Sequence, residues 1–164
     1  MKKTTKKHTL YVCYAAAVAA LYVSLTFLAK LFGLDSGAIQ IRFSEMLCVL
    51  PIFMPASIPG ITLGCLISNL LVGAHWLDIV IGPVATLIGA LGTYALRRFK
   101  WIAPLPAVLS NALIIPFVLA YGYGMEQVIP LMMVTVGVGE LISVYGFGSF
   151  LVAGSERFKR IFNQ

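Results

Sequence analysis

The chain has 164 residues, of which 60% are hydrophobic and only 11% are charged, against about 25% charged residues in an ordinary soluble domain. So few charges cannot cover the surface that a soluble domain of this size exposes. The composition therefore excludes a free cytosolic enzyme, a DNA-binding domain and a disordered tail, and it favours a small all-α integral membrane protein with no nucleic-acid partner.

Charged and proline-rich connections divide the chain into six apolar segments. A spanning helix needs about 20 apolar residues, and four of the segments have the length of one such helix. The uncharged run between Glu45 and Asp78 has 32 residues, and Pro51, Pro55 and Pro59 interrupt it, which indicates two short helices. The spans expected for a single membrane domain, 1–164, are about 9–30, 44–55, 58–73, 78–96, 102–122 and 127–152.

The basic residues indicate how these spans are oriented. With six spans and an N-terminus inside the cell, ten of the twelve Lys and Arg residues lie on the inner side, and only Lys30 and Arg42 lie on the outer side. Five spans would place the basic C-terminal tail outside. We therefore expect both termini in the cytoplasm. The first apolar run is about 20 residues long, which exceeds the core of a cleaved signal peptide, so we expect this run to be the first span.

Two carboxylates lie within or next to these spans. Glu140 lies near the centre of the sixth span, where an acidic residue costs about 3 kcal/mol. A ligand, an ion or a neighbouring helix must offset that cost. Glu45 lies at the outer boundary of the second span, where an exposed carboxylate is tolerated, and Arg42 could pair with it across one turn. A functional and a structural role are both open for Glu45.

Other polar and small residues in the spans are compatible with either a functional or a structural role. The amide of Asn111, in the middle of the fifth span, suits the edge of a heterocycle, or it makes an ordinary interhelical hydrogen bond. Trp76 lies at the outer end of a span, where tryptophan is most often an interfacial anchor. Small residues at four-residue spacing in the first span suit either the docking of another protein or packing within the bundle. They are Ala15, Ala16, Ala19 and Ala20.

No motif for catalysis is present. The sequence holds no nucleophile elbow, zinc-protease motif or P-loop, so we expect neither an enzyme nor a catalytic residue. Cys13, Cys48 and Cys65 all lie in apolar spans without the spacing of metal ligands, and we expect no metal and no cofactor. Uphill transport by such a chain would need an ion gradient or partner subunits.

Several motifs resemble those of the QueT family. They are Gln40-Ile-Arg42-Phe43-Ser44-Glu45, Leu-Pro51-Ile-Phe-Met-Pro55, Ile-Pro-Gly60-x-x-Leu-Gly64-Cys-x-Ile-Ser-Asn69, Leu77-Asp78-Ile-Val, Ala103-Pro104-Leu-Pro106 with Asn111, and Val138-Gly139-Glu140-Leu. The resemblance covers nearly the whole chain, from about Ala16 to about Leu151.

The resemblance implies a six-helix S-component, the substrate-binding subunit of an energy-coupling factor (ECF) transporter in a bacterial cell membrane. Such a subunit binds a vitamin-like molecule in an outward-facing pocket beneath its first outer loop. It works with a transmembrane coupling subunit and two ATPase subunits, which drive reorientation of the bundle. The alanine stripe of the first helix would dock the coupling subunit. For the QueT family the ligand is a queuosine precursor, chiefly 7-aminomethyl-7-deazaguanine.

The candidate site residues fit that ligand. A carboxylate can accept the ring N–H and the exocyclic amine of a guanine-like edge together, and a second acid would favour the aminomethyl ammonium. We expect Glu140 and Glu45 to fill these roles, in an order that stays open. Asn111 or Gln40 would bind the remaining polar edge, near Arg42, and an aromatic ring would stack on the ligand. The candidates for stacking are Phe43, Trp76 and Tyr145.

The sequence leaves two kinds of alternative function open. The chain could be an S-component for another vitamin or a purine-like compound. In a different class, it could be a small channel or an intramembrane enzyme that uses Glu140 as a proton or cation site. The absence of a nucleophile–base pair argues against the hypothesis of an intramembrane enzyme.

Overall fold

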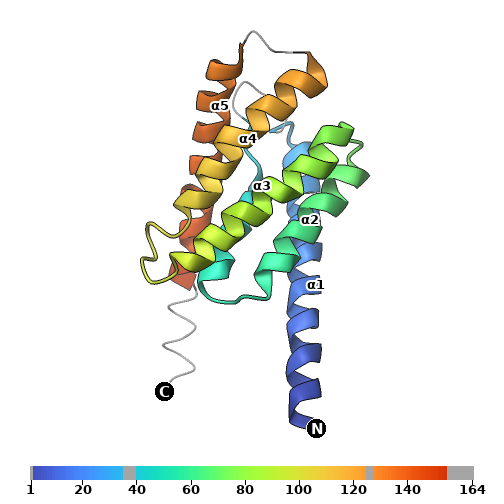
Figure 1. Ribbon diagram of the computed structural model, residues 1–164, viewed down its shortest axis with the longest axis vertical. Helices are drawn as coiled ribbons and strands as arrows, with labels where there is room; N and C mark the ends of the chain where they lie inside the picture. Colours follow the sequence, from blue (N-terminus) through green and yellow to red (C-terminus); the bar gives the residue numbers. More distant parts are fainter. Residues whose placement is uncertain (1, 35–39, 125–127, 155–164) are drawn as a thin grey trace.

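The computed structural model describes residues 2–34, 40–124 and 128–154, and over these ranges the chain is helical without strands. The elements are α1 (Lys2–Leu31), the 3-10 helix η1 (Phe43–Ile52), α2 (Ser57–Leu71), α3 (Trp76–Ala95), α4 (Leu105–Tyr123) and α5 (Ile129–Leu141). A π-helical segment, η3 (Ile142–Phe147), continues α5, and the helix then runs on to Gly154. Figure 1 shows these elements as one bundle.

Four helical segments are long and apolar enough to cross a membrane: Lys7–Leu31, Trp76–Ala95, Leu105–Tyr123 and Ile129–Gly154. The apolar helices η1 and α2 are shorter, with 10 and 15 residues. Large apolar side chains such as Leu109, Val134 and Phe150 are exposed on the outside of the bundle, as expected where lipid tails surround the protein. The chain is therefore a multi-pass helical membrane protein, and the count of six crossings stays a prediction.

Proline separates the two short helices. η1 ends at Ile52 and α2 begins at Ser57, so that Pro55 lies in the connection. Pro59 lies in the first turn of α2, where the missing backbone N–H has no intrahelical partner to lose. Because η1 is short and largely buried, it carries Ser44 and Glu45 into the interior of the bundle.

Two glycines bring α1 and α2 into close contact. A Cβ atom on Gly60 would lie 2.7 Å from the carbonyl oxygen of Ala15, and one on Gly64 would lie 2.6 Å from the Cβ atom of Tyr22. The two glycines are four residues apart and share one face of α2, as in small-residue packing motifs of membrane helices. This contact fixes Tyr22 against the core.

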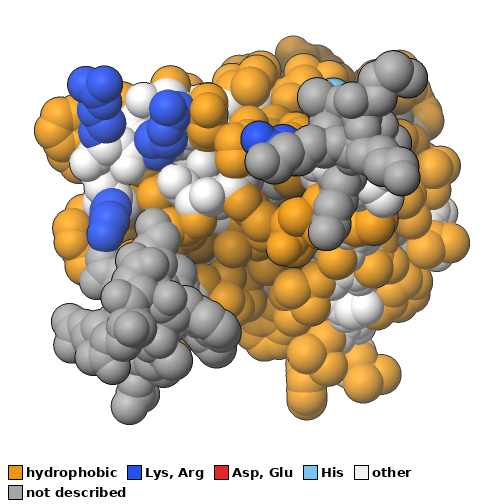
Figure 2. Space-filling model, turned by 90° about the horizontal axis from the view of Figure 1, so that it is seen from below, with side chains coloured by type: hydrophobic (Ala, Val, Ile, Leu, Met, Phe, Trp, Pro, Cys, Tyr) orange, Lys and Arg blue, Asp and Glu red, His pale blue; other side chains and the backbone are white. Residues whose placement is uncertain are grey.

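The described chain begins and ends at the same end of the molecule, where the N-terminal part of α1 projects beyond the bundle (Figure 1). The connection between α3 and α4, which carries the exposed Arg97, Arg98 and Lys100, lies at this end as well. Figure 2 shows this end from below, with basic side chains and no visible acidic ones among the described atoms. An inner membrane face is expected to have this charge pattern.

Candidate functional site

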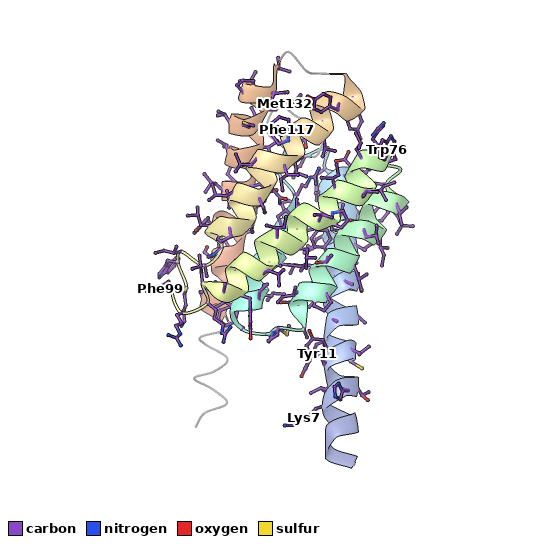
Figure 3. All side chains as sticks on the ribbon, viewed as in Figure 1. Lys7, Tyr11, Trp76, Phe99, Phe117 and Met132 are labelled. Carbon is purple, nitrogen blue, oxygen red and sulfur yellow. The ribbon has the colours of Figure 1, made fainter. Side chains whose placement is uncertain are left out.

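A cavity of about 600 Å³ lies at the opposite end of the bundle. Its lining comes from the C-terminal parts of α1, α2 and α4, the N-terminal parts of α3 and α5, and the residues before and at the start of η1. Figure 3 labels one lining residue, Met132, at this end. The volume is typical of a small-molecule site. The polar residues of the lining include Thr26, Lys30, Gln40, Arg42, Ser44, Asn69, Asp78, Tyr123 and Thr135.

Glu45 lies directly behind this lining and is almost completely buried. The hydroxyl group of Tyr22 donates a hydrogen bond of 2.5 Å to its Oε1 atom. The Oε2 atom accepts from the Cys48 thiol at 3.1 Å and from the Asn111 amide at 3.4 Å. Tyr22 and Ser44 both line the cavity, so the carboxylate of Glu45 holds part of the cavity wall in place.

Glu140 is the second buried acid, and one of its carboxylate oxygens has no hydrogen-bond partner among the described residues. It follows Val136, a residue of the cavity lining, by one turn on the same face of α5. The side chain of Asn111 interacts with Glu140 as well as with Glu45. Within the described part of the chain, no group donates a hydrogen bond to the buried Oε2 atom of Glu140, and the buried Oγ atom of Ser44 has no partner either. An unpaired buried polar atom costs about 1–3 kcal/mol, which makes both atoms candidates for ligand contact.

The residues before η1 connect the cavity to α5 beside Glu140. Gln40 and Arg42 both line the cavity. The backbone carbonyl group of Gln40 rests on Gly139, where a Cβ atom would collide with it. The backbone N–H of Arg42 donates to the Ser143 hydroxyl at 3.2 Å, and the Arg42 guanidinium lies within electrostatic reach of both Glu45 and Glu140.

Asp78 forms a further acidic position, in the first turn of α3. It lines the cavity, and only 5% of its surface is exposed. The hydroxyl of Tyr123 donates to its Oδ2 atom at 3.0 Å, and the Asn69 amide donates to its backbone oxygen at 2.8 Å. The sequence shows Asp78 at the outer end of a span without indicating that α2 and α4 supply it with partners.

The three aromatic residues expected to stack on a ligand do not belong to the lining of this cavity. The ring of Phe43 packs edge-on against that of Phe147, with centroids 5.2 Å apart. Trp76 is 64% exposed, and Figure 3 shows it on the outside of the bundle. Tyr145 packs against the core around η1. The aromatic residues that do line the cavity are Tyr22 and Tyr123.

The alanine stripe of α1 divides into two faces. Ala19 is buried and Ala15 half-buried, and the backbone oxygens of both approach the glycines of α2. Ala16 and Ala20 are exposed. One half of the stripe therefore packs within the bundle, whereas the other half leaves a smooth surface on the outside.

Among the described residues, the Asp78 carboxylate, several hydroxyl groups and amides, and the cations Lys30 and Arg42 line a cavity at one end of the bundle. In the described ranges, no group of three His, Cys, Asp or Glu residues could hold a metal ion. This arrangement suits the recognition of a small polar solute by hydrogen bonds and charge. The fold and the cavity are thus those of a membrane protein with room for a small molecule.

The chain belongs to the QueT transporter family, whose family model matches residues 12–157. It is 41% identical over 96 residues to the queuosine precursor transporter QueT of Lactococcus lactis subsp. cremoris (strain MG1363). That match covers 58% of this chain and 56% of the relative, so the chain spans little more than half the length of the relative. No solved structure gives a significant match. The resemblance predicted from the motifs is confirmed, and it places the chain in a family of transporters rather than enzymes.

Proposed function

We propose that this chain is the substrate-binding S-component of an ECF-type importer in a bacterial plasma membrane. It would bind a queuosine precursor such as 7-aminomethyl-7-deazaguanine from outside and deliver it inward. Membership of the QueT family supports the transporter role, and the name of the Lactococcus relative supports the ligand class. The cavity and the connection with Arg97, Arg98 and Lys100 lie at opposite ends of the bundle, which supports an outward-facing site and cytoplasmic termini in a chain that crosses the membrane six times.

One observation carries the assignment of the ligand-binding residues: the unpaired Oε2 atom of Glu140, buried one helical turn from the lining residue Val136. In this proposal Glu140 accepts the ring N–H and the exocyclic amine of the deazaguanine, which form a pair of charge-assisted hydrogen bonds. The Ser44 hydroxyl, Asn111 and Gln40 bind the remaining polar atoms of the ring. Glu45 lies behind the cavity lining and keeps Tyr22 in position.

Delivery would need partners. A coupling subunit would dock on the exposed Ala16 and Ala20 face of α1, where small side chains allow close approach of another helix. Two ATPase subunits would drive reorientation of the whole bundle, so that the cavity releases its ligand on the inner side.

The test is binding of 7-aminomethyl-7-deazaguanine to the purified full chain in lipid nanodiscs, measured by calorimetry. We expect Glu140→Gln to weaken binding about ten- to a hundredfold, since a hydrogen bond to a charged group is worth about 1.5–3 kcal/mol, and Glu45→Gln to weaken it less. Thr93→Val is the control, because Thr93 is a buried polar residue of α3 outside the cavity lining. Thermal melts verify that each variant is folded.

Wild-type affinity in both Glu140→Gln and Glu45→Gln would contradict this site. Mass spectrometry of small molecules retained after purification tests the ligand independently. A retained deazaguanine supports the proposal, whereas a different retained vitamin or purine would replace the proposed substrate.

A further inference from the structure

Glu45 is poorly placed to bind the ammonium group of a cationic ligand, because its two oxygens already have protein partners. Tyr22 donates to one oxygen, and Cys48 and Asn111 donate to the other. Three of its about four acceptor positions are thus occupied, and Glu45 lies behind the lining of the cavity and not on it. The second acid that a cationic ligand needs must therefore be sought on the cavity lining itself.

Asp78 meets this requirement. Its carboxylate lines the cavity, and Tyr123 donates to Oδ2 alone, while no described residue donates to Oδ1. The Tyr123 hydroxyl accepts a hydrogen bond from the backbone N–H of His75 at 3.2 Å, so its proton is directed at Asp78. Asn69 fixes the backbone of Asp78 from α2. The carboxylate is thus held in one orientation with one oxygen left for a ligand.

The charges around the cavity favour a cation. Among the described residues, the acids Asp78, Glu45 and Glu140 lie at the cavity or directly behind it, together with the bases Lys30 and Arg42. The Lys30 ammonium donates to the backbone oxygen of Val72 at 3.0 Å, and the Arg42 guanidinium lies near Glu45 and Glu140. Among these residues, neither base is paired with the Asp78 carboxylate, which leaves it available to a cationic group of a ligand.

The proposed ligand has two groups that an acid can bind, and they are too far apart for a single carboxylate to bind both. In 7-aminomethyl-7-deazaguanine the aminomethyl group and the guanine-like N–H edge lie on different edges of the bicyclic ring. One acid therefore cannot bind both. Glu140 follows the lining residue Val136 toward the interior on α5, whereas Asp78 lies at the start of α3, at the outer end of the cavity.

We propose that Asp78 is the specificity-determining residue that binds the ammonium group of a cationic precursor, with Tyr123 as its positioning residue. This inference rests on the proposed function, since it requires that the cavity binds a 7-deazaguanine. It predicts that the site distinguishes the cationic aminomethyl compound from a neutral compound with the same ring.

The experiment compares two ligands on the full chain in nanodiscs: 7-aminomethyl-7-deazaguanine and its neutral nitrile analogue, 7-cyano-7-deazaguanine. We expect Asp78→Asn to weaken binding of the aminomethyl compound about tenfold or more, as for the loss of a charge-assisted hydrogen bond, and to change binding of the cyano compound less than about threefold. Asp78→Glu should restore part of the preference for the cation. Tyr123→Phe should lower this preference by a smaller factor.

Equal loss for both ligands in Asp78→Asn would overturn the inference, because it would indicate a structural role only. Unchanged binding of both ligands would overturn it as well. If Asp78→Asn does not fold, the test uses Asp78→Glu and Tyr123→Phe instead. The inference is overturned if both variants keep the wild-type ratio of affinities for the aminomethyl and the cyano compound. Failure of the wild-type chain to bind either compound would instead remove the proposed function, and this inference with it.

Discussion

At the scale of single residues, Gly139 joins the cavity wall to the helix that carries Glu140. The backbone carbonyl group of Gln40 occupies the space where any other residue would have its Cβ atom. Gln40 and Arg42 line the cavity, so their position depends on this contact. The absence of a side chain at Gly139 is thus a requirement of the site and not only of the helix.

We expect Gly139→Ala to displace the residues before η1, to lower the free energy of unfolding by about 1–3 kcal/mol, and to weaken ligand binding. Gly137→Ala is the matched control two residues away, because its new Cβ atom would meet only the Ala112 side chain at 3.5 Å, an ordinary contact. Thermal melts and calorimetric titrations check both variants. Equal behaviour of the two alanines would contradict the role assigned to Gly139.

The site could be predicted from the sequence only in part. Acids are costly in a membrane, and this cost identifies Glu140 as a residue that needs a partner. Glu45 is expected at the boundary of its span, where the sequence leaves its role open, whereas the structure buries it. Nothing local identifies Tyr22 as the partner of Glu45, because a tyrosine in an apolar helix is as often an interfacial anchor. The sequence shows Asp78 only as a residue at the end of a span, since its partners come from α2 and α4 and are not its neighbours in the sequence.

At the scale of elements, α1 has two faces that the sequence does not distinguish. Four alanines at four-residue spacing look alike, but the glycines of α2 cover Ala15 and Ala19 and leave Ala16 and Ala20 exposed. The positions of Gly60 and Gly64 against α1 determine which pair of alanines is covered. This is a tertiary contact, and the sequence of α1 alone does not indicate it. The exposed pair is the surface that a coupling subunit would use in the proposed function.

We expect Ala20→Leu to leave ligand binding by the isolated chain unchanged and to impair association with the coupling subunit. The added bulk would cost about 1–3 kcal/mol of docking free energy, which lowers the affinity about five- to a hundredfold. Copurification with the coupling subunit and uptake of labelled precursor by cells are the measurements. Val84→Leu, at an exposed position of α3, is the control, and an equal effect of both variants would argue against docking on this face.

At the scale of the whole molecule, the class of fold follows directly from hydropathy. The prediction of an all-helical, multi-pass membrane protein is confirmed, because long apolar runs have few alternatives in a bilayer. The 3-10 form of η1 and the π form of η3 were not predicted. Pro51 lies inside η1, and the Ser143 hydroxyl of η3 donates to the backbone oxygen of Gly139 and accepts from the backbone N–H of Arg42. Hydropathy does not report such features.

The orientation in the membrane can be tested with two matched positions. Phe32 and Phe99 are 65% and 63% exposed and lie in connections that the proposed topology puts on opposite sides. In a Cys13→Ala background, we expect a membrane-impermeant maleimide to label Phe32→Cys in intact cells and Phe99→Cys only after permeabilisation. The reverse pattern would contradict cytoplasmic termini, and labelling of both from the same side would contradict the proposed topology.

The π-helical segment η3 has a consequence for how this chain can diverge. It begins two residues after Glu140, and Ser143 within it contacts the residues that line the cavity. A π turn holds one residue more than the α-helical turn it replaces. Deleting one residue here would rotate the helix beyond it by about 100° relative to Glu140. Chains that keep the same ligand should therefore tolerate substitutions in this turn far more readily than a change in its length.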